Sequence, residues 1–410
     1  MKQKILVIGI TMNCAGTEKS FLSFASALDY GKYDVDLLLA KKEGLFLSLL
    51  PPQIRIIEME EYGDMFQLSS GNAVKTIWNC FGKKNPLVLF EVFPYLLKIL
   101  LNKKSRSKTA TRLWCRLLQK FPSVKENYDI AVAYWGDRSM FYMVDKVSAK
   151  KKIAWLHFDY GNPPRDDKTY LNYFLKCDRV VTVSSVIDQS LRSHLPQIAD
   201  RCVLMENINN PQLVRDMAGH GDSFTDHSFA GKRILTVGRI SEQKGYDMAV
   251  EALALLCRDG FDVKWYILGG GEEQDIRVLR DQAATLNVED RLVFLGTTVN
   301  PYPYIKDCDL YVQPSRHEGK PIAVEEAKIL SKPIVVTNYL SAHEQLKNGL
   351  FGEICEISSE GIYRSCKHLL ENSTLREAFM EELSRHTFGN SEEIQKFYQM
   401  VKYDSRESKS

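Results

Sequence analysis

Two carboxylates lie eight positions apart within residues 316–327, and a proline stands between them. The preceding residues, 309–314, are predicted to form a short buried strand that ends at its proline. Because Pro321 suits the first helical position, Glu318 is predicted in the loop before a helix, and Glu326 on the edge of that helix's packed face. A buried carboxylate needs a partner, and two acids beside a helix N-terminus could bind a polyhydroxylated, anionic ligand. An ordinary surface loop followed by a helix would show the same spacing.

A glycine and two cations follow a second predicted strand, at residues 233–237. Gly238 permits a tight turn and a close approach to a ligand, and Arg239 and Lys244 come just before a predicted helix. Two fixed cations and a helix N-terminus would stabilise a departing diphosphate more in the transition state than in the ground state. We therefore expect that neither a metal nor another cofactor is required. The alternative is that both cations are solvated surface residues.

Both blocks resemble motifs of one enzyme family. Glu318-Gly319, Pro321 and Glu326-Ala327 are similar to the glutamate–seven residues–glutamate signature of retaining glycosyltransferases of family 4. Residues 234–245 resemble that family's donor-phosphate loop, and the two blocks occur in the family's order. The resemblance is strong over residues 230–355 and thinner over the N-terminal half. It implies an α/β chain with the GT-B fold, in which two Rossmann-like domains face each other across a cleft.

The resemblance also assigns roles in the transfer of a hexose from a nucleotide diphosphate sugar. Glu318 would contact the hydroxyls of the donor sugar and Glu326 the ribose, while Arg239 and Lys244 would hold the diphosphate. On the donor side it adds Gly16, Thr17, Gly238, Gly269, Val299 and Gly319. Lys320 and residues 337–344 depart from the family pattern, which usually has an apolar residue and a glycine pair there. The identity of the donor sugar therefore stays open.

A similar arrangement is expected near the start of the chain. Residues 4–10 are apolar after Lys4, which predicts the first strand of a parallel sheet. Thr17 is predicted as the N-cap of a helix that carries Phe21 and Phe24 on one face. A strand, a glycine loop and a helix present backbone N–H groups to a phosphate or a sugar. The segment Ala15-Gly16-Thr17 has one glycine fewer than the family's turn, and a simple tight connection is the alternative.

Two further predicted strands end in residues that could face a ligand. In open α/β sheets, ligands bind outside the carboxyl ends of the strands, and His157 ends the strand predicted at 153–157. A lone histidine is more often structural, but this one matches a strand-end histidine of the family, which implies a catalytic position beside the reacting centre. Trp135 and Asp137 follow the strand that ends at Tyr134 and would suit a sugar acceptor.

Residues 87–120 combine apolar bulk with positive charge. No acidic residue occurs between Glu91 and Glu126, whereas basic residues accumulate there: Lys98, Lys103, Lys104, Arg106, Lys108, Arg112, Arg116 and Lys120. Such a segment could lie on an anionic bilayer, where each basic residue contributes roughly 1 kcal/mol. A core helix with a solvated basic end is the alternative. Because a lipid-linked acceptor would require membrane contact, an anionic membrane surface is an expected partner.

The length of 410 residues exceeds a single hydrophobic core, so two domains are expected. We place them at 1–206 and 232–388, with a polar linker at 207–231 and a C-terminal helix and polar tail at 389–410 that return to the first domain. A net charge of +2 argues against nucleic acid as a partner, and nine cysteines without metal spacing favour reduced thiols. With neither a secretory signal nor an apolar run long enough to span a membrane, we expect a cytoplasmic protein, peripheral on the inner face of the cell membrane.

Three patterns are attributed to structure rather than to chemistry. Asp307 and Asp309 have the spacing of a metal-binding acidic motif, but they lead into the predicted strand before Glu318, so no metal site is expected. Residues 34–36 likewise open a strand. Residues 268–274 lack the third glycine of a dinucleotide fingerprint.

The sequence thus predicts a retaining, metal-independent hexosyltransferase whose acceptor is a saccharide, expected to be lipid-linked, in cell-surface polysaccharide assembly. A catalytically silent GT-B protein that activates another transferase is the main alternative. A nicotinamide-dependent oxidoreductase is a weaker one, because the glycine fingerprint is incomplete.

Overall fold

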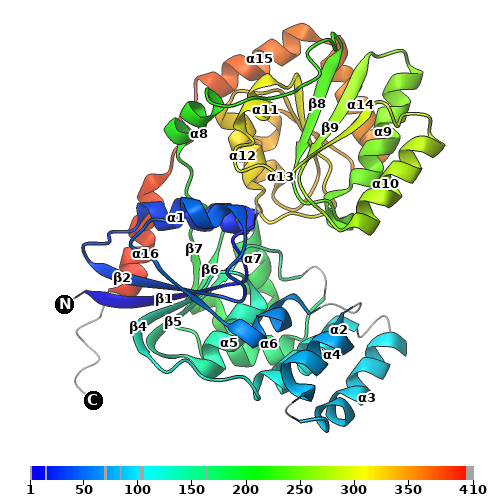
Figure 1. Cartoon of the computed structure of the whole chain (residues 1–410). Helices are drawn as coiled ribbons and strands as arrows, with labels where there is room; N and C mark the ends of the chain where they lie inside the picture. The colour runs from blue at the N-terminus through cyan, green and yellow to red at the C-terminus, as the bar shows by residue number, and fades with distance from the viewer. Residues whose placement is uncertain are drawn as a thin grey trace. The chain divides into compact units, whose positions relative to one another are not determined.

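The computed structural model describes residues 2–13, 16–68, 72–83, 85–101, 106–161 and 164–402 (Figure 1). Of Leu100 only the backbone is described. By its internal contacts the chain divides into two compact units. The first comprises Met1–Asn13, Phe24–Glu206 and Glu392–Ser410, and the second comprises Cys14–Ser23 and Asn207–Ser391. The predicted polar tail at 403–410 lies outside the described residues.

A seven-stranded parallel sheet forms the centre of the first unit, in the order β3-β2-β1-β4-β5-β6-β7. Its strands are β1 (Gln3–Gly9), β2 (Tyr33–Leu39), β3 (Arg55–Glu58), β4 (Asn127–Ala133), β5 (Ser148–Leu156), β6 (Arg179–Thr182) and β7 (Cys202–Leu204). The apolar residues of β1 and β4 are buried on both faces, as expected for a parallel sheet covered on both sides.

The helices of the first unit include a group inserted between β3 and β4 (Figure 1). That group is α2 (Ala73–Ile77), α3 (Val88–Leu101) and α4 (Arg106–Leu118), preceded by a 3-10 helix at Glu60–Gln67. The other helices are α5 (Asp137–Lys146), α6 (Asp167–Phe174), α7 (Ser185–His194) and α16 (Ile394–Val401). Helix α1 (Gly16–Ala27) begins in the second unit and ends in the first.

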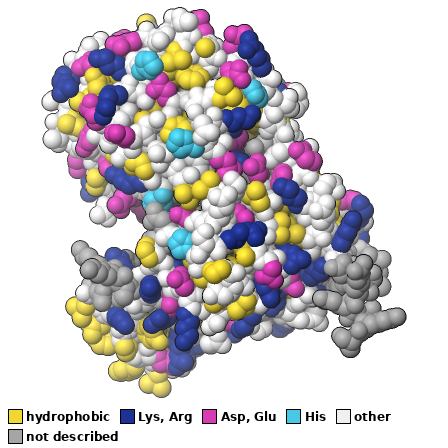
Figure 2. All heavy atoms as spheres, turned by 180° about the vertical axis from the view of Figure 1, so that it is seen from behind, with side chains coloured by type: hydrophobic (Ala, Val, Ile, Leu, Met, Phe, Trp, Pro, Cys, Tyr) yellow, Lys and Arg dark blue, Asp and Glu magenta, His cyan; other side chains and the backbone are white. Residues whose placement is uncertain are grey.

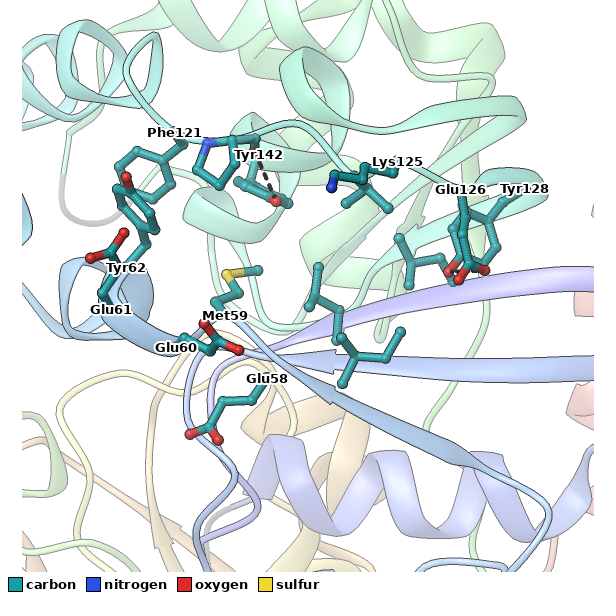
Figure 3. A pocket seen from close by; sticks show the side chains of 15 residues that line it. Glu58, Met59, Glu60, Glu61, Tyr62, Phe121, Lys125, Glu126, Tyr128 and Tyr142 are labelled. Atoms are coloured by element: carbon teal, nitrogen blue, oxygen red, sulfur yellow. Dashed lines mark hydrogen bonds between the residues drawn. The ribbon is translucent and has the colours of Figure 1, made fainter.

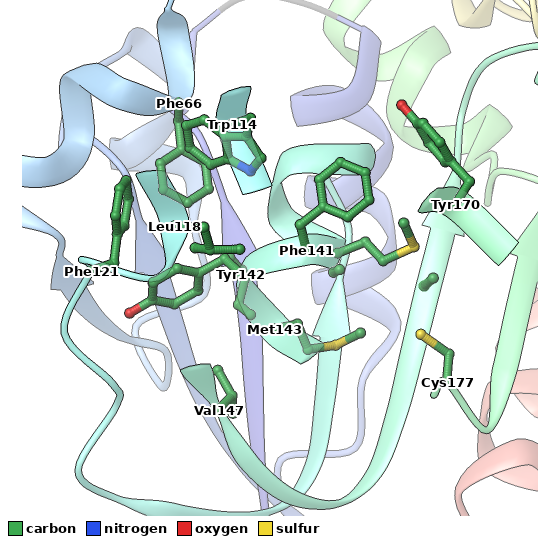
Figure 4. Packing of buried hydrophobic residues seen from close by; sticks show 14 of the residues in the cluster. Phe66, Trp114, Leu118, Phe121, Phe141, Tyr142, Met143, Val147, Tyr170 and Cys177 are labelled. Carbon is green, nitrogen blue, oxygen red and sulfur yellow. The ribbon is translucent and has the colours of Figure 1, made fainter. Parts of the chain in front are cut away.

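Helix α4 is anchored in the aromatic core of the first unit, as Figure 4 shows. The Trp114 ring packs edge-on against Phe66 and Phe121, with centroid separations of 5.1 and 5.5 Å, and Tyr142 closes the cluster. Within residues 87–120, α4 therefore agrees with the alternative expectation of a core helix whose basic residues are exposed. Lys103 and Lys104, from the same basic stretch, lie outside the described residues.

The C-terminal helix α16 packs against the beginning of the first unit. Phe397 contacts the ring of Phe24 at 5.0 Å, and Tyr398 stacks on Tyr33 at 5.8 Å. The Tyr398 hydroxyl accepts a hydrogen bond of 2.9 Å from the Asp29 backbone N–H. These contacts explain why residues from Glu392 onward belong to the first unit.

A six-stranded parallel sheet forms the second unit, in the order β10-β9-β8-β11-β12-β13. Its strands are β8 (Lys232–Val237), β9 (Val263–Leu268), β10 (Leu292–Gly296), β11 (Leu310–Gln313), β12 (Ile334–Thr337) and β13 (Glu353–Cys355). One face is covered by α9 (Tyr246–Arg258), α10 (Glu273–Thr285) and α14 (Ser359–Glu371). The other carries α8 (Pro211–Ala218), α11 (Tyr302–Asp307), α12 (Ile322–Ile329) and α13 (Ala342–Gln345), and α15 (Ser373–Ser384) packs against the cores of both faces. Two parallel-sheet units with helices on both faces confirm the predicted α/β class.

Three sequence expectations differ from the structure in detail. Thr17 is the second residue of α1 rather than its N-cap, because the helix already begins at Gly16. Pro321 stands one residue before α12, with an extended backbone (ψ 119°), rather than inside it. The segment 207–231 is not a bare linker: it contains α8, and Val214, Ala218 and Phe224 pack into the core of the second unit. Its polar composition concealed these few apolar anchors.

Candidate functional site

Glu318 is held by three donors at a single carboxylate oxygen. Its Oε1 accepts hydrogen bonds from Lys244 Nζ at 2.6 Å, from Ser315 Oγ at 2.7 Å and from Gln313 Nε2 at 3.2 Å. The residue is only 8% exposed. Among the described residues no donor reaches its other oxygen, Oε2. A buried carboxylate group fixed in this way can accept hydrogen bonds from a ligand without reorganising.

The ends of β11 and β12 position the donors of Glu318. Gln313, the last residue of β11, accepts a hydrogen bond of 2.8 Å at Oε1 from the Tyr311 hydroxyl, and this contact orients its amide group toward Glu318. Thr337, the last residue of β12, donates to the backbone carbonyl of Gln313 at 3.2 Å and also to that of Ser315. The loop that carries Glu318 is therefore tied to two neighbouring strands at their carboxyl ends.

The loop after β8 brings Lys244 to this position. The Gly238 carbonyl accepts a 2.7 Å hydrogen bond from the Tyr246 hydroxyl, which closes the turn. Gly245 has a positive φ of 67°, and a Cβ there would lie 2.1 Å from the Pro314 carbonyl oxygen, so only glycine fits. A Cβ on Gly269 would lie 2.0 Å from the Gly238 carbonyl oxygen, which explains the glycine at the end of β9. The two glycines let three strand ends approach closely.

Not all residues of the predicted donor side are brought into this network. Gly319 is buried beside Glu318, whereas Arg239 and Val299 are exposed. No carboxylate in the described part of the chain pairs with Arg239. Lys244 is thus the predicted cation that meets Glu318, and Arg239 extends into solvent.

Glu326 lies inside α12, only 3% exposed, and has the partner that its burial requires. Its Oε1 forms an ion pair with Lys19 Nζ and accepts a 3.2 Å hydrogen bond from the Tyr302 hydroxyl of α11. Lys19 belongs to Cys14–Ser23, the segment of the second unit in which α1 begins. The predicted residues Gly16 and Thr17 open the same helix. Ala15, from the same motif, lies outside the described residues.

The segment that departs from the family pattern forms its own buried network. The Tyr339 hydroxyl donates to Gln345 Oε1 at 2.7 Å, and Gln345 Nε2 donates to Glu325 Oε1 at 2.9 Å. Lys328 Nζ lies 2.8 Å from Glu325 Oε2. Burial opposes ionisation of Glu325, but the positive charges of Lys328 and Lys320 hold its pKa below the ordinary value. This network ties α12 to Gln345, the last residue of α13.

The predicted site residues of the first unit lie at the carboxyl ends of β4 and β5. His157 follows β5, and its ring packs 4.8 Å from that of Tyr134. Its buried Nε2 has no hydrogen-bond partner among the described residues, and burial lowers its pKa to about 3, so the imidazole is neutral at pH 7. Asp137 begins α5 and accepts a 2.5 Å hydrogen bond from the Tyr170 hydroxyl. Trp135 is buried just ahead of it.

The acidic pair set aside in the sequence has structural partners. Asp307 accepts a 2.6 Å hydrogen bond from Ser223, and Asp309 accepts from Lys232 Nζ and from the Arg233 backbone N–H, both at 2.9 Å. Within the described residues no group of three or more His, Cys, Asp or Glu side chains could hold a metal ion. Asp309 fixes the start of β11 against β8.

A cavity of about 500 Å³ in the first unit lies apart from these residues (Figure 3). It is lined by apolar residues of the sheet, Leu6, Leu38 and Ile57, and by carboxylates such as Glu58 and Glu60. None of the predicted site residues lines it. It therefore does not contribute to the arrangement around Glu318 and Glu326.

The sequence predicted the two glutamates and Lys244 as site residues. It did not predict that Lys244 pairs with Glu318, nor the other side chains that hold the glutamates. Gln313 and Ser315 could have been suspected, because polar residues at the end of a buried strand require hydrogen-bond partners. Lys19 and Tyr302 carry no comparable sequence feature, since they reach Glu326 from distant parts of the chain.

The chain is similar in sequence to known glycosyltransferases. Residues 227–385 match the family described as "Glycosyl transferases group 1". Over 160 residues the chain is 31% identical to N-acetylgalactosamine-N,N'-diacetylbacillosaminyl-diphospho-undecaprenol 4-alpha-N-acetylgalactosaminyltransferase of Campylobacter jejuni, covering 38% of this chain and 41% of that enzyme. It is 28% identical over 283 residues to the lipopolysaccharide core biosynthesis glycosyltransferase LpsE of Rhizobium meliloti, covering 67% of this chain and 75% of the relative. The match to the Campylobacter enzyme thus spans less than half of that relative's length.

Solved structures share the fold over nearly the whole chain. Anabaena HepE in complex with UDP and glucose superposes with a TM-score of 0.70 at 15% identity, covering 97% of this chain and 99% of that one. S. aureus TarM, in a complex that includes UDP, gives a TM-score of 0.66 at 13% identity, covering 98% of this chain and all (100%) of that one. The predicted GT-B fold is confirmed, and both sequence motifs lie within residues 227–385, the part that matches the model of the glycosyl transferases group 1 family.

Proposed function

We propose that this chain transfers a hexose from a nucleotide diphosphate sugar to a saccharide acceptor, with retention of the anomeric configuration. The observation that carries the proposal is the arrangement of Glu318: it is buried, paired with Lys244 at 2.6 Å, and open to a ligand at Oε2. That oxygen suits the hydroxyls of a donor sugar. The family match of residues 227–385 and the motif resemblance support the same reaction.

In the proposed reaction the bond between the sugar's anomeric carbon and the diphosphate oxygen breaks, and its electron pair stays on the diphosphate oxygen. A bond from an acceptor hydroxyl oxygen forms on the same face, and the hydroxyl proton passes to the departing diphosphate. Lys244 and Arg239 stabilise the negative charge that develops on the leaving group. Because two cations supply this stabilisation, the transfer needs no divalent metal ion.

The remaining predicted residues take their roles from the family resemblance. Glu326 holds the ribose, Gly269 lies towards the nucleobase, and Val299 and the turn at Gly16 and Thr17 contribute to the donor side. His157, neutral because of its burial, lies beside the reacting centre as a hydrogen-bonding group rather than as a cation. Trp135 and Asp137 contact the acceptor.

The acceptor we propose is a lipid-linked saccharide in the assembly of a cell-surface polysaccharide. The names of several relatives support this: an undecaprenol-linked substrate in Campylobacter jejuni, lipopolysaccharide core in Rhizobium meliloti and capsular polysaccharide in Staphylococcus aureus. A lipid-linked acceptor requires the enzyme to work at a membrane surface. None of the helices in the described part of the chain is both long and apolar enough to cross a membrane.

Helix α3 supplies a surface for peripheral binding to the membrane. Phe90, Phe93, Leu97 and Leu101 recur at helical spacing on one face, and Phe90 and Phe93 are 78% and 62% exposed. Exposed cations from α3 and α4 accompany this face: Lys98, Arg106, Lys108, Arg112 and Arg116. Figure 2 shows hydrophobic side chains gathered beside Lys and Arg side chains at this end of the first unit. We propose that the apolar face inserts into an anionic bilayer whose headgroups meet the cations.

Vesicle sedimentation with phosphatidylglycerol-containing vesicles tests the membrane proposal. Phe90→Gln/Phe93→Gln should lose binding, whereas Leu213→Gln/Val278→Gln, which alters two exposed apolar residues of the second unit, should bind like the parent. Binding should also weaken as salt rises, because exposed charges are screened over about 8 Å at physiological ionic strength. If the α3 variant binds as tightly as the parent, the face is not a membrane surface.

A panel of nucleotide sugars tests the catalytic proposal against the alternative of a silent GT-B partner protein. The purified chain should hydrolyse one donor slowly, and the sugar first released should keep the donor's anomeric configuration by NMR. Glu318→Gln should abolish this turnover while leaving the melting temperature within a few degrees of the parent's. A well-folded chain that neither binds nor hydrolyses any donor would instead favour the silent partner.

A further inference from the structure

Lys19 is the only charged side chain of the described residues that contacts Glu326. The two side chains are 18% and 4% exposed, so the ion pair is largely shielded from water. Lys19 lies in the first turn of α1, and the segment Cys14–Ser23 belongs to the same unit as α12. Lys19 lies outside the family motifs at residues 15–17, 234–245 and 318–327. Its position in the sequence gives no indication that it pairs with Glu326.

Tyr302 completes the site from a third element. Its hydroxyl donates to Glu326 Oε1 at 3.2 Å, and Lys19 Nζ lies 4.3 Å from the centre of its ring. Burial by itself would lower the pKa of Lys19, but the negative charge of Glu326 raises it above its ordinary value, so the lysine stays charged. Helices α1, α11 and α12 thus converge on one carboxylate oxygen.

The arrangement repeats that of Glu318. In each case a lysine and a hydroxyl occupy Oε1, Lys244 with Ser315 in one and Lys19 with Tyr302 in the other. No donor from the described residues reaches Oε2 of Glu326. A carboxylate that is charged, buried and open on one oxygen is suited to accept the two hydrogen bonds of a vicinal diol.

We propose that Lys19 is a positioning residue for donor binding: it fixes Glu326 so that Oε2 accepts hydrogen bonds from the ribose 2′- and 3′-hydroxyls. This inference rests on the proposed function, in which Glu326 holds the ribose. Lys19 itself does not touch the donor; it acts through the carboxylate. The contact therefore contributes to binding of the nucleotide in the ground state and the transition state alike.

Removal of Lys19 leaves Tyr302 as the sole described donor to a buried carboxylate. Glu326 then either takes up a proton or turns towards water, and in both cases it loses its fixed orientation toward the diol. Hydrogen bonds to a charged group are worth roughly tenfold to hundredfold in a binding constant. We expect Lys19→Met to raise the donor KM and the nucleoside diphosphate Kd by that factor while kcat stays within about threefold.

Calorimetric titration of the full chain with UDP and with GDP, each beside its 2′,3′-dideoxy analogue, tests the inference. The parent should bind the ribose form of its nucleotide more tightly than the dideoxy form. Lys19→Met should lose most of that preference, Lys19→Arg should retain it, and Tyr302→Phe should lose part of it. Lys232→Met removes an ion pair of the same unit, with Asp309, and serves as the control that binds like the parent.

Each outcome separates the inference from the proposed function. If Lys19→Met keeps the parent's preference for the ribose form, Lys19 does not act through Glu326, although the transferase assignment stands. The same holds if Lys19→Met and Lys19→Arg lose affinity equally for both forms, because only a general structural role would do so. If the parent binds neither diphosphate nor any donor, the proposed function itself fails. Melting curves of every variant exclude unfolding as the cause.

Discussion

Arg239 and Lys244 are proposed to stabilise the same leaving group, yet their surroundings predict different consequences for folding. Lys244 forms a 2.6 Å ion pair with Glu318, and the two side chains are 19% and 8% exposed. Breaking a buried ion pair by removing one partner typically costs about 3–5 kcal/mol. In the Lys244→Met variant, Glu318 would keep the neutral donors Gln313 and Ser315, and in the parent Lys244 is partly solvated. We therefore expect Lys244→Met to lower the free energy of unfolding by about 2 kcal/mol. For a unit of this size that corresponds to a fall in Tm of about 4–8 °C.

Arg239→Ala should leave stability almost unchanged. The side chain is exposed and has no carboxylate partner among the described residues, and surface substitutions of this kind usually stay within about 0.5 kcal/mol. Its contribution arises only as the diphosphate becomes charged. Loss of one preorganised donor to developing charge costs on the order of 3 kcal/mol, or about a hundredfold in rate, so kcat should fall far more than donor affinity.

The assay combines turnover with thermal unfolding. Initial rates of donor hydrolysis or transfer give kcat and KM for each variant, and Arg277→Ala, an exposed cation of α10, controls for the loss of a surface charge. If the Arg239→Ala variant is folded and has the kcat of the parent, Arg239 does not stabilise the leaving group. Lys244→Met that melts at the parent's temperature would show that the ion pair with Glu318 contributes little to the folded state.

Three further predictions concern the metal, the second glutamate and pH. Activity should survive excess EDTA, and turnover that is lost in EDTA and restored by manganese would overturn the role of the two cations. Glu326→Gln should mainly raise the donor KM, whereas Glu318→Gln should change kcat as well, and equal effects of both on kcat would contradict the distinction. Burial lowers the pKa of His157 to about 3, below its unfolded value of about 6.5, so only the unfolded chain binds that proton as the pH falls. Between pH 7.5 and 5 the parent should lose about 2 kcal/mol more unfolding free energy than His157→Asn, measured by urea unfolding, and parallel losses would refute the buried neutral state.

Most strands could be predicted because buried parallel strands have a pattern that depends little on tertiary context. The mostly apolar runs within β1, β8 and β9 are examples. Strand β13 was missed: it is three residues long and lies at the edge of its sheet, where a run such as Glu353–Cys355 shows neither continuous apolarity nor alternation. The prediction of a polar linker at 207–231 was wrong for a related reason, because α8 is anchored by only a few apolar side chains within a polar stretch.

The candidate site was predictable where chemistry depends on spacing along the chain. The positions of Glu318 before a helix and Glu326 within it followed from one proline and from helical periodicity. Their partners could not follow from spacing, since Lys244 and Lys19 meet the glutamates only after β8, α1 and α12 are brought together by folding. The need for partners was predictable from the cost of burying a charge; their identity was not.

The paired glutamates argue for a ligand site rather than for stability. A buried ion pair gains little over a well-packed apolar pair of the same volume, because the desolvation of both charges offsets their attraction. Two such pairs, Lys244 with Glu318 and Lys19 with Glu326, are therefore a costly way to hold α12 in place. They become favourable if each carboxylate must stay ionised, fixed through one oxygen and open at the other when a polyhydroxylated ligand arrives. On this reasoning Glu326→Leu together with Lys19→Met should retain the parent's Tm within a few degrees while abolishing recognition of the ribose hydroxyls. A double variant that unfolds outright would instead show that the Lys19–Glu326 pair is primarily structural.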